Sequence, residues 1–206
     1  FDEYLLSAFK NKNIPNKRFK GNTLNEIDEI KKNDGTPFKV FTPFWRAAEK
    51  YYIEKIPSKE KIIKKCKKKV NYFKNCIEPE KILPKKNWFK KFEKYWKVSE
   101  NDSKKILKNL IENKIKDYGT SRDIPSIEGT SKLSPYIKHG QIHVGSIWKK
   151  CSEIKSKGIG YRKYINELGW REFSHSLINY FPEFLKGNFR KEFDKFPWAK
   201  NEKFLK

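Results

Sequence analysis

Apolar side chains recur at helical spacing between Ser99 and about Tyr118, and this stretch is the clearest element that the sequence predicts. Ser99 and Asp102 form a near capping box at its start, and Gly119 suits its C-terminal end. The helix is therefore expected to turn an aliphatic stripe toward a core. This stripe consists of Ile106, Leu107, Leu110, Ile111 and Ile115.

A second long helix is predicted from about Tyr161 to Tyr180, where Pro182 ends the pattern because proline cannot continue a helix. Between the two long helices lies a loop, and a short helix is expected to begin after it at Ser134 or Pro135.

The pattern is weaker toward the N-terminus. Residues 1–41 are rich in Asn, Lys, Pro and Gly without a sustained period, so an extended or irregular segment is expected. Thr42-Pro43 is typical of an N-cap followed by proline at the first helical position, and predicts a helix toward Tyr52. Ser58 is predicted to cap a short lysine-rich helix.

No stretch alternates as a strand would, so the predicted fold class is all-α. Residues 70–98 are interpreted as a mixed linker. We divide the chain into a linker, residues 1–98, and a helical domain, residues 99–206. The chain contains no methionine, begins at Phe1 and stops at Lys206 within an aromatic, charged run, so a piece of a longer protein is expected.

Composition adds two points. Aromatic residues make up 16% of the chain and hydrophobic residues only 36%, so large rings must carry much of the burial, which suits a stacked planar ligand. The net charge of +23 permits DNA binding, because basic side chains neutralise phosphates. All but six of the 48 basic residues are lysine, however, a bias that an AT-rich genome gives unaided. Runs such as residues 64–69 are accordingly interpreted as solvated surface.

Several other classes of function lack support. No apolar stretch is long enough to span a membrane and no signal peptide is found, so a cytoplasmic protein is expected. Cys66, Cys76 and Cys151 are scattered, which fits unpaired thiols in a reducing compartment. The histidines have no further ligands nearby for a metal, and Gly158 and Gly160 form a lone GxG turn rather than a nucleotide fingerprint.

The segment EGTSKLSPYIKHG, residues 128–140, places the hydroxyls of Thr130, Ser131 and Ser134 at a loop-to-helix junction. Free backbone N–H groups and the positive helix end at such a junction favour a phosphate or diphosphate. Taken alone, a string of this kind is more often a plain helix cap, so both interpretations stay open.

The segment NELGWREF, residues 166–173, lies on the second long helix. One face of this helix carries Tyr164, Glu167, Arg171 and Ser174, and Trp170 flanks it. The face could be solvent-exposed, with a weak surface ion pair between Glu167 and Arg171. Alternatively, Trp170 stacks on an extruded base, Glu167 binds the edge of that base and Arg171 holds flavin or DNA phosphate.

Together the two segments resemble the flavin-binding half of the DNA photolyase and cryptochrome family, strongly from about residue 99 to 206. GTPFKVFTPFWRA, residues 35–47, looks like the connector into the helical domain of that family. Lys132 replaces the usual arginine and keeps the cation, while His143 replaces a common serine or threonine and weakens a cap. The resemblance implies FAD, active when reduced, with a linker from an α/β antenna domain whose chromophore the sequence does not identify. The positions that it assigns to FAD are Tyr118, Thr130, Ser131, Lys132, Leu133, Ser134, Tyr164 and Arg171.

The resemblance also implies light-driven repair of cyclobutane pyrimidine dimers, most like that of a class I photolyase. Glu167 and Trp170 would be the catalytic residues that contact the flipped dimer, and Arg122 would lie at the DNA-facing edge of the groove. Reduced flavin would absorb blue light, donate an electron to the dimer and regain it after the ring splits. The implied partner is damaged DNA, bound by a monomer, with no membrane.

Two other functions stay open: a cryptochrome-type blue-light receptor with the same pocket, and a basic helical DNA-binding module without a cofactor. In the second, the singled-out residues would be ordinary caps and surface. Further flavin contacts and the tryptophan chain for photoreduction belong to the rest of such a protein. Residues 1–206 alone are therefore expected to bind flavin poorly and not to repair DNA.

Overall fold

The computed structural model describes residues 2–16, 21–52 and 84–197, and within these ranges it contains helices and no strand. The all-α prediction is confirmed. None of the described helices combines the length and the apolar character that a membrane span requires. The α-helices are α1 (Asp2–Asn11), α2 (Phe41–Tyr51), α4 (Glu100–Asn109), α5 (Tyr118–Ser121), α6 (Ser134–Lys138), α7 (Val144–Ser152) and α8 (Ile159–Tyr180). Short 3₁₀ segments are η1 (Ile27–Glu29), η2 (Asn87–Lys94), η4 (Pro182–Leu185) and η5 (Lys191–Lys195).

The chain forms two compact units. Unit 1 consists of Phe1–Tyr52 and Arg162–Lys206, and unit 2 of Ile53–Tyr161. Each unit is a group of residues that contact one another more than they contact the rest of the chain. The predicted division into residues 1–98 and 99–206 concerns which part of a longer protein each segment represents, and it stays a prediction.

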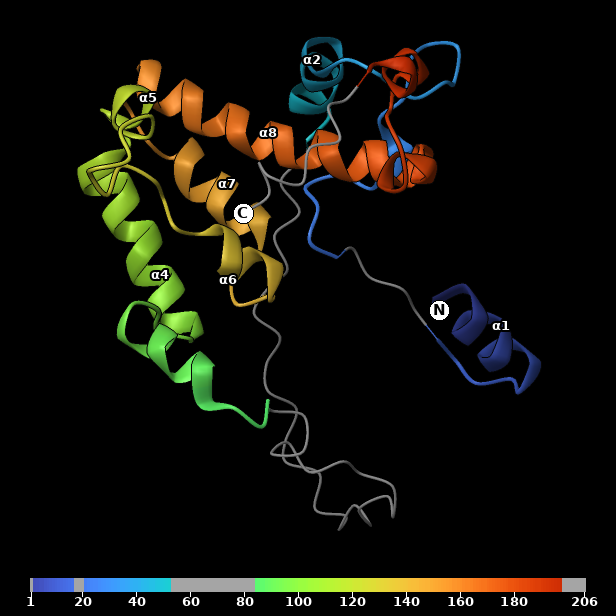
Figure 1. Cartoon of the computed structure of the whole chain (residues 1–206), viewed down its shortest axis with the longest axis horizontal. Helices are drawn as coiled ribbons and strands as arrows, with labels where there is room; N and C mark the ends of the chain where they lie inside the picture. The colour runs from blue at the N-terminus through green and yellow to red at the C-terminus, as the bar shows by residue number, and fades with distance from the viewer. Residues whose placement is uncertain (1, 17–20, 53–83, 198–206) are drawn as a thin grey trace. The chain divides into compact units, whose positions relative to one another are not determined.

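In unit 1, α2 lies beside α8 (Figure 1). The rings of Phe44 and Phe173 pack 5.2 Å apart, and Phe44, Trp45 and Ala48 are buried. The helix predicted toward Tyr52 is therefore confirmed, but its start was wrong. The helix begins at Phe41 with Val40 as the N-cap, two residues before the predicted start, because the aromatic face that it buries includes Phe41.

The prediction that residues 1–41 are irregular was wrong for α1, a helix over Asp2–Asn11. Its half-buried residues Leu5, Leu6 and Phe9 recur at helical spacing, and Lys10 lies in its last turn, where a cation suits the helix dipole. The lysine-rich helix predicted after Ser58 lies outside the described residues, and so do the runs at 64–69 and 70–83.

In unit 2, the predicted Ser99 cap is confirmed: its Oγ accepts a hydrogen bond from the Asp102 N–H at 3.0 Å. The end of this helix differs from the prediction. The α-helix stops at Asn109 and continues as a π-helical turn, η3 (Leu110–Lys114), closed by a 2.8 Å bond from the Ile115 N–H to the Leu110 carbonyl. The wider turn keeps Leu110 and Ile115 both buried, and Gly119 falls inside α5 instead of ending the helix.

The short helix predicted from Ser134 is confirmed as α6, whereas α7 was not predicted. Val144, Ile147 and Cys151 of α7 are fully buried, and this packing forms the helix despite the early glycine. His143 caps it, because its Nδ1 accepts a hydrogen bond from the Gly145 N–H at 3.1 Å. The imidazole thus takes the place of the hydroxyl that a cap usually uses.

The long helix α8 runs from Ile159 to Tyr180, as predicted within two residues, and Pro182 follows it. The GxG interpretation was partly wrong, because Gly160 lies in the first turn of α8 rather than in a loop. A Cβ on Gly160 would lie 2.2 Å from the Ile115 carbonyl oxygen, so glycine allows the close backbone approach at this point.

Candidate functional site

The loop of the first motif folds back onto α5 in unit 2. A Cβ on Gly129 would lie 2.0 Å from the Ser121 carbonyl oxygen, so only glycine permits the approach. Lys132 adopts a left-handed backbone with a φ of 54°, and the next residue, Leu133, is 1% exposed. The loop is therefore held at its start by the contact of Gly129 with Ser121 and at its end by the burial of Leu133. The hydroxyl-bearing residues lie between them or directly after them.

Lysines stabilise this loop from both sides. Lys114 donates hydrogen bonds to the carbonyls of Glu128 at 2.6 Å and Thr130 at 3.4 Å, and Lys132 pairs with the Glu128 carboxylate. The Lys132 hydrogen bond and charge hold the pKa of Glu128 below its usual range. Lys132 and Glu128 neutralise each other, so the net positive charge at this loop edge comes from Lys114.

A cavity of about 230 Å³ in unit 2 adjoins this edge. Ser131 and Lys132 of the motif line it together with Lys105 and Lys114. Thr130 is exposed, and Ser134 is the exposed first residue of α6. Because α6 has only five residues, any positive potential comes from the lysines in the lining rather than from the helix end. The cavity has four lysines against two acidic residues, Asp102 and Glu128, so its net charge is positive.

Two further predicted residues meet in unit 2. Tyr118 is buried, and the guanidinium of Arg122 lies 5.9 Å from the centre of its ring. Arg122 also pairs with Asp123 at 3.2 Å. This pair lies directly after α5, where Arg122 is the C-cap.

The second motif lies on α8 in unit 1. Tyr164 is 2% exposed, Glu167 is half-buried, and Trp170 is 47% exposed. The Trp170 indole stacks on Phe41, with ring centroids 3.8 Å apart and planes 8° from parallel. Trp170 is therefore accessible and also held in one orientation, which a solvent-exposed tryptophan without a partner would not be.

Arg171 forms an ion pair with Glu172, and the distance from its Nη1 to the Glu172 carboxylate oxygen is 2.9 Å. Glu172 was not singled out from the sequence. Its side chain is buried and also accepts a 2.7 Å hydrogen bond from the Leu24 N–H. The sequence does contain a signal that points to Glu172. This residue lies four positions after Leu168 on the apolar face of the helix, where a charged residue is unusual.

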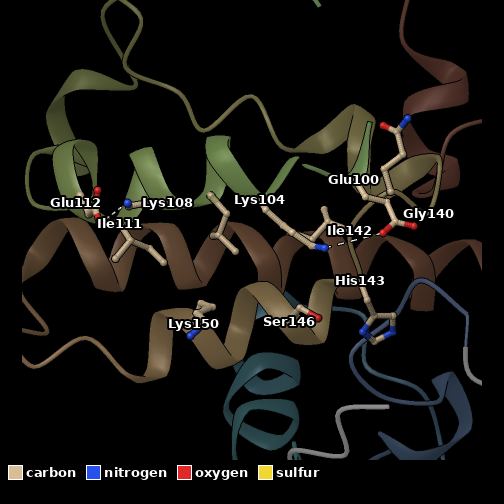
Figure 2. Close-up of a pocket in the computed structure, with 12 residues that line it drawn as sticks. Glu100, Lys104, Lys108, Ile111, Glu112, Gly140, Ile142, His143, Ser146 and Lys150 are labelled. Carbon is tan, nitrogen blue, oxygen red and sulfur yellow. Dashed lines mark ion pairs between the residues drawn. The ribbon is translucent and has the colours of Figure 1, made fainter. Parts of the chain in front are cut away.

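Another cavity lies in unit 2 between α4 and α7, with a volume of about 760 Å³ (Figure 2). Its apolar lining includes Leu107, Ile111 and Ile142, and its charged edge includes Glu100 paired with Lys104 and Glu112 paired with Lys108. None of the predicted site residues lines this cavity. Each ion pair joins residues one turn apart, within α4 for Glu100 and Lys104 and across the junction of α4 and η3 for Lys108 and Glu112.

Comparison with known proteins finds the same family that the two motifs resemble. A sequence model described as DNA photolyase matches residues 1–63. The deoxyribodipyrimidine photo-lyase of Agrobacterium fabrum is 30% identical over 213 residues, which cover 100% of this chain and 43% of that protein. The enzyme of the same name from Alkalihalophilus pseudofirmus is 31% identical over 186 residues, 88% of this chain and 38% of that protein.

A solved structure, that of a bacterial class III photolyase from Agrobacterium tumefaciens, superimposes on 99% of this chain with a TM-score of 0.76 at 29% identity. The match covers 43% of that structure. The fold is thus that of a helical part of a photolyase, and the chain belongs to the DNA photolyase family. It spans less than half the length of the curated relatives it matches. The class I assignment stays a prediction, since this solved structure is that of a class III photolyase.

Proposed function

We propose that the protein to which this chain belongs repairs cyclobutane pyrimidine dimers in DNA, using light absorbed by FAD. The observation that carries the proposal is the exposed indole of Trp170, held flat against Phe41 at 3.8 Å, with Glu167 one turn away on the same helix. A flipped-out base needs an aromatic surface that is accessible and already oriented, and a polar group to bind its edge.

The residues present fit an FAD cofactor. Lys132 and Ser131 line a cavity with three further lysines, which outnumber its two acidic residues and so suit the anionic diphosphate. The residues proposed to hold the cofactor are Tyr118, Thr130, Ser131, Lys132, Leu133, Ser134, Tyr164 and Arg171. When bound in its reduced form, FAD would supply the electron that opens the cyclobutane ring.

The protein residues would bind and orient the damaged bases. Trp170 would stack on the flipped dimer, and Glu167 would hydrogen-bond to its edge and so stabilise the charge that develops there. Arg122 would contact DNA at the edge of the groove, and the net charge of +23 would add affinity that does not depend on sequence. The monomeric state, the cytoplasmic location and the antenna chromophore stay predictions.

The first experiment uses the reading frame extended to its own start and stop. The purified protein is incubated with an oligonucleotide that contains a thymine dimer, in blue light and in the dark, and loss of the dimer is followed. Repair that requires light supports the proposal. Bound flavin without repair would point to a cryptochrome-type receptor, and the absence of both would point to a DNA-binding module.

The role of Glu167 is tested by Glu167→Ala in the same extended protein. We expect the repair rate to fall roughly tenfold to a hundredfold, the loss typical of a hydrogen bond to a charged group, while flavin stays bound. Glu183→Ala, at an exposed position just beyond α8, is the control. An unchanged repair rate in Glu167→Ala would exclude the assigned role.

A further inference from the structure

Glu172 joins two parts of unit 1 that are far apart in the sequence. Its carboxylate accepts a hydrogen bond from the Leu24 N–H at 2.7 Å, across 148 residues of sequence. The same side chain is only 4% exposed. It also accepts a 2.9 Å hydrogen bond from the Nη1 of Arg171. One buried carboxylate therefore ties the segment before η1 to α8 and also contacts a proposed cofactor residue.

The contact is shielded from bulk solvent, because the side chain of Glu172 is only 4% exposed. Together with Ser176, one turn further along α8, it lines a cavity of only about 10 Å³. Asn25 and Phe44 close the same cavity from the segment before η1 and from α2. A hydrogen-bonded ion pair is strengthened where solvent is excluded, and removing one of its members is costly there.

The direction of the Arg171 side chain follows from this pair. Adjacent residues on a helix do not face each other, so Arg171 contacts Glu172 only when its side chain bends toward it. A free arginine has many rotamers to lose on binding a ligand, whereas a guanidinium already held by a buried carboxylate has fewer. Arg171 has a side chain 22% exposed, so it is partly open to a ligand.

We propose that Glu172 is a positioning residue that acts through Arg171: it fixes the guanidinium in the orientation that binds an anionic group of the flavin, and it holds Leu24 against α8. This inference rests on the proposed function, because Arg171 is a flavin contact only if FAD is bound. It adds Glu172 and the backbone at Leu24 to the residues on which cofactor affinity depends.

The test measures the dissociation constant of FAD in the extended protein by the fluorescence of released flavin. Glu172→Gln keeps an acceptor for the Leu24 N–H but removes the charge that holds Arg171. We expect it to weaken FAD binding by about tenfold, in line with loss of one charged hydrogen bond. Glu183→Gln, an exposed glutamate just beyond α8, is the matched control and should bind FAD as the wild type does.

A double-mutant cycle separates positioning from a general loss of stability. If Glu172 acts through Arg171, the double variant Glu172→Gln, Arg171→Gln binds FAD no more weakly than Arg171→Gln alone. A residue that matters only for folding would lower the unfolding temperature and leave FAD affinity unchanged. Additive losses, or a Glu172→Gln variant equal to the control, would overturn the proposal.

A second variant covers the case in which Glu172→Gln does not fold. Glu172→Asp keeps the charge but shortens its reach by one methylene, so we expect FAD affinity between those of the wild type and Arg171→Gln. Wild-type affinity in Glu172→Asp would overturn the proposal. A wild-type protein that binds no FAD would instead refute the proposed function, so the two failures are distinguishable.

Discussion

Glu172 illustrates how a single residue can carry opposing electrostatic effects. Burial raises its pKa from 4.5 to about 7, while the Leu24 N–H and the charge of Arg171 act in the opposite direction. Desolvation is the largest of these effects. Glu26 lines the same small cavity, and His175, on the same helix, has its pKa lowered by burial and by Arg171.

The raised pKa predicts a specific dependence of stability on pH. Between about pH 4.5 and 7 the folded state binds more protons at Glu172 than the unfolded state does, so the free energy of unfolding decreases as pH rises through this window. The loss is at most about 3 kcal/mol. Urea unfolding of residues 1–206 at pH values across the window should show this loss in the wild type and not in Glu172→Gln.

The comparison between the two proteins isolates Glu172. His175 has a lowered pKa, so its contribution has the opposite sign: it adds stability as pH rises, and it is present in both proteins. Glu183→Gln should behave as the wild type does. Equal pH profiles for the wild type and Glu172→Gln would show that the carboxyl titrates normally in the folded protein.

Trp170 shows what packing adds to a single side chain. The sequence indicated that its ring could stack on a base, and the structure shows that Phe41 lies parallel to it at 3.8 Å. Phe41 is the first residue of α2, far from Trp170 in the sequence. Sequence spacing could not predict this contact, because it depends on how α2 packs against α8.

At the scale of the elements, α2 and α8 meet at a glycine. A Cβ on Gly169 would lie 2.5 Å from the indole of Trp45, which is 6% exposed. Gly169 therefore lets the helix approach the buried ring, and it stands in the middle of the second motif, directly before Trp170. The same glycine that brings the helices together thus also sets where Trp170 lies.

We predict that Gly169→Ala destabilises residues 1–206 by about 1–3 kcal/mol, the usual cost of overpacking a core. The gain in helix propensity, at most about 1 kcal/mol, is smaller than the cost of displacing a buried indole. Thermal unfolding measures the effect. Gly158→Ala, where an added methyl meets nothing within 4 Å, is the control, and an equal unfolding temperature for both variants would contradict the prediction.

The start of α4 offers a second prediction at this scale. Ser99→Ala removes the side-chain acceptor of the Asp102 N–H and should cost about 1 kcal/mol in the free energy of unfolding. The exposed Ser126 lies in a loop of the same unit, so Ser126→Ala should be close to neutral. Urea denaturation of both variants tests the difference, and a neutral Ser99→Ala would show that solvent replaces the cap.

For the whole molecule, we predict that residues 1–206 retain much less than stoichiometric FAD, whereas the extended reading frame retains it fully. The chain spans 43% of the Agrobacterium fabrum relative. Flavin absorbance against protein concentration, measured for both proteins purified in the same way, gives the ratio. Stoichiometric FAD on residues 1–206 would contradict this prediction.

The sequence by itself determined the class of the fold, the helices around Ser99 and from 161 to 180, and the family. Caps, prolines and apolar periodicity are local signals, so they can be interpreted without knowing which segments meet. The two motifs also indicated the candidate site residues, although their roles stay proposals.

Only the tertiary structure decided the rest. It formed α7 by burying Val144, Ile147 and Cys151, produced the π-helical turn after Asn109, and paired Arg171 with a buried Glu172 that also binds Leu24. Each of these features depends on contacts between segments that are distant in the sequence. Local propensity is weak compared with the burial of a side chain, and burial is fixed only when the segments pack together.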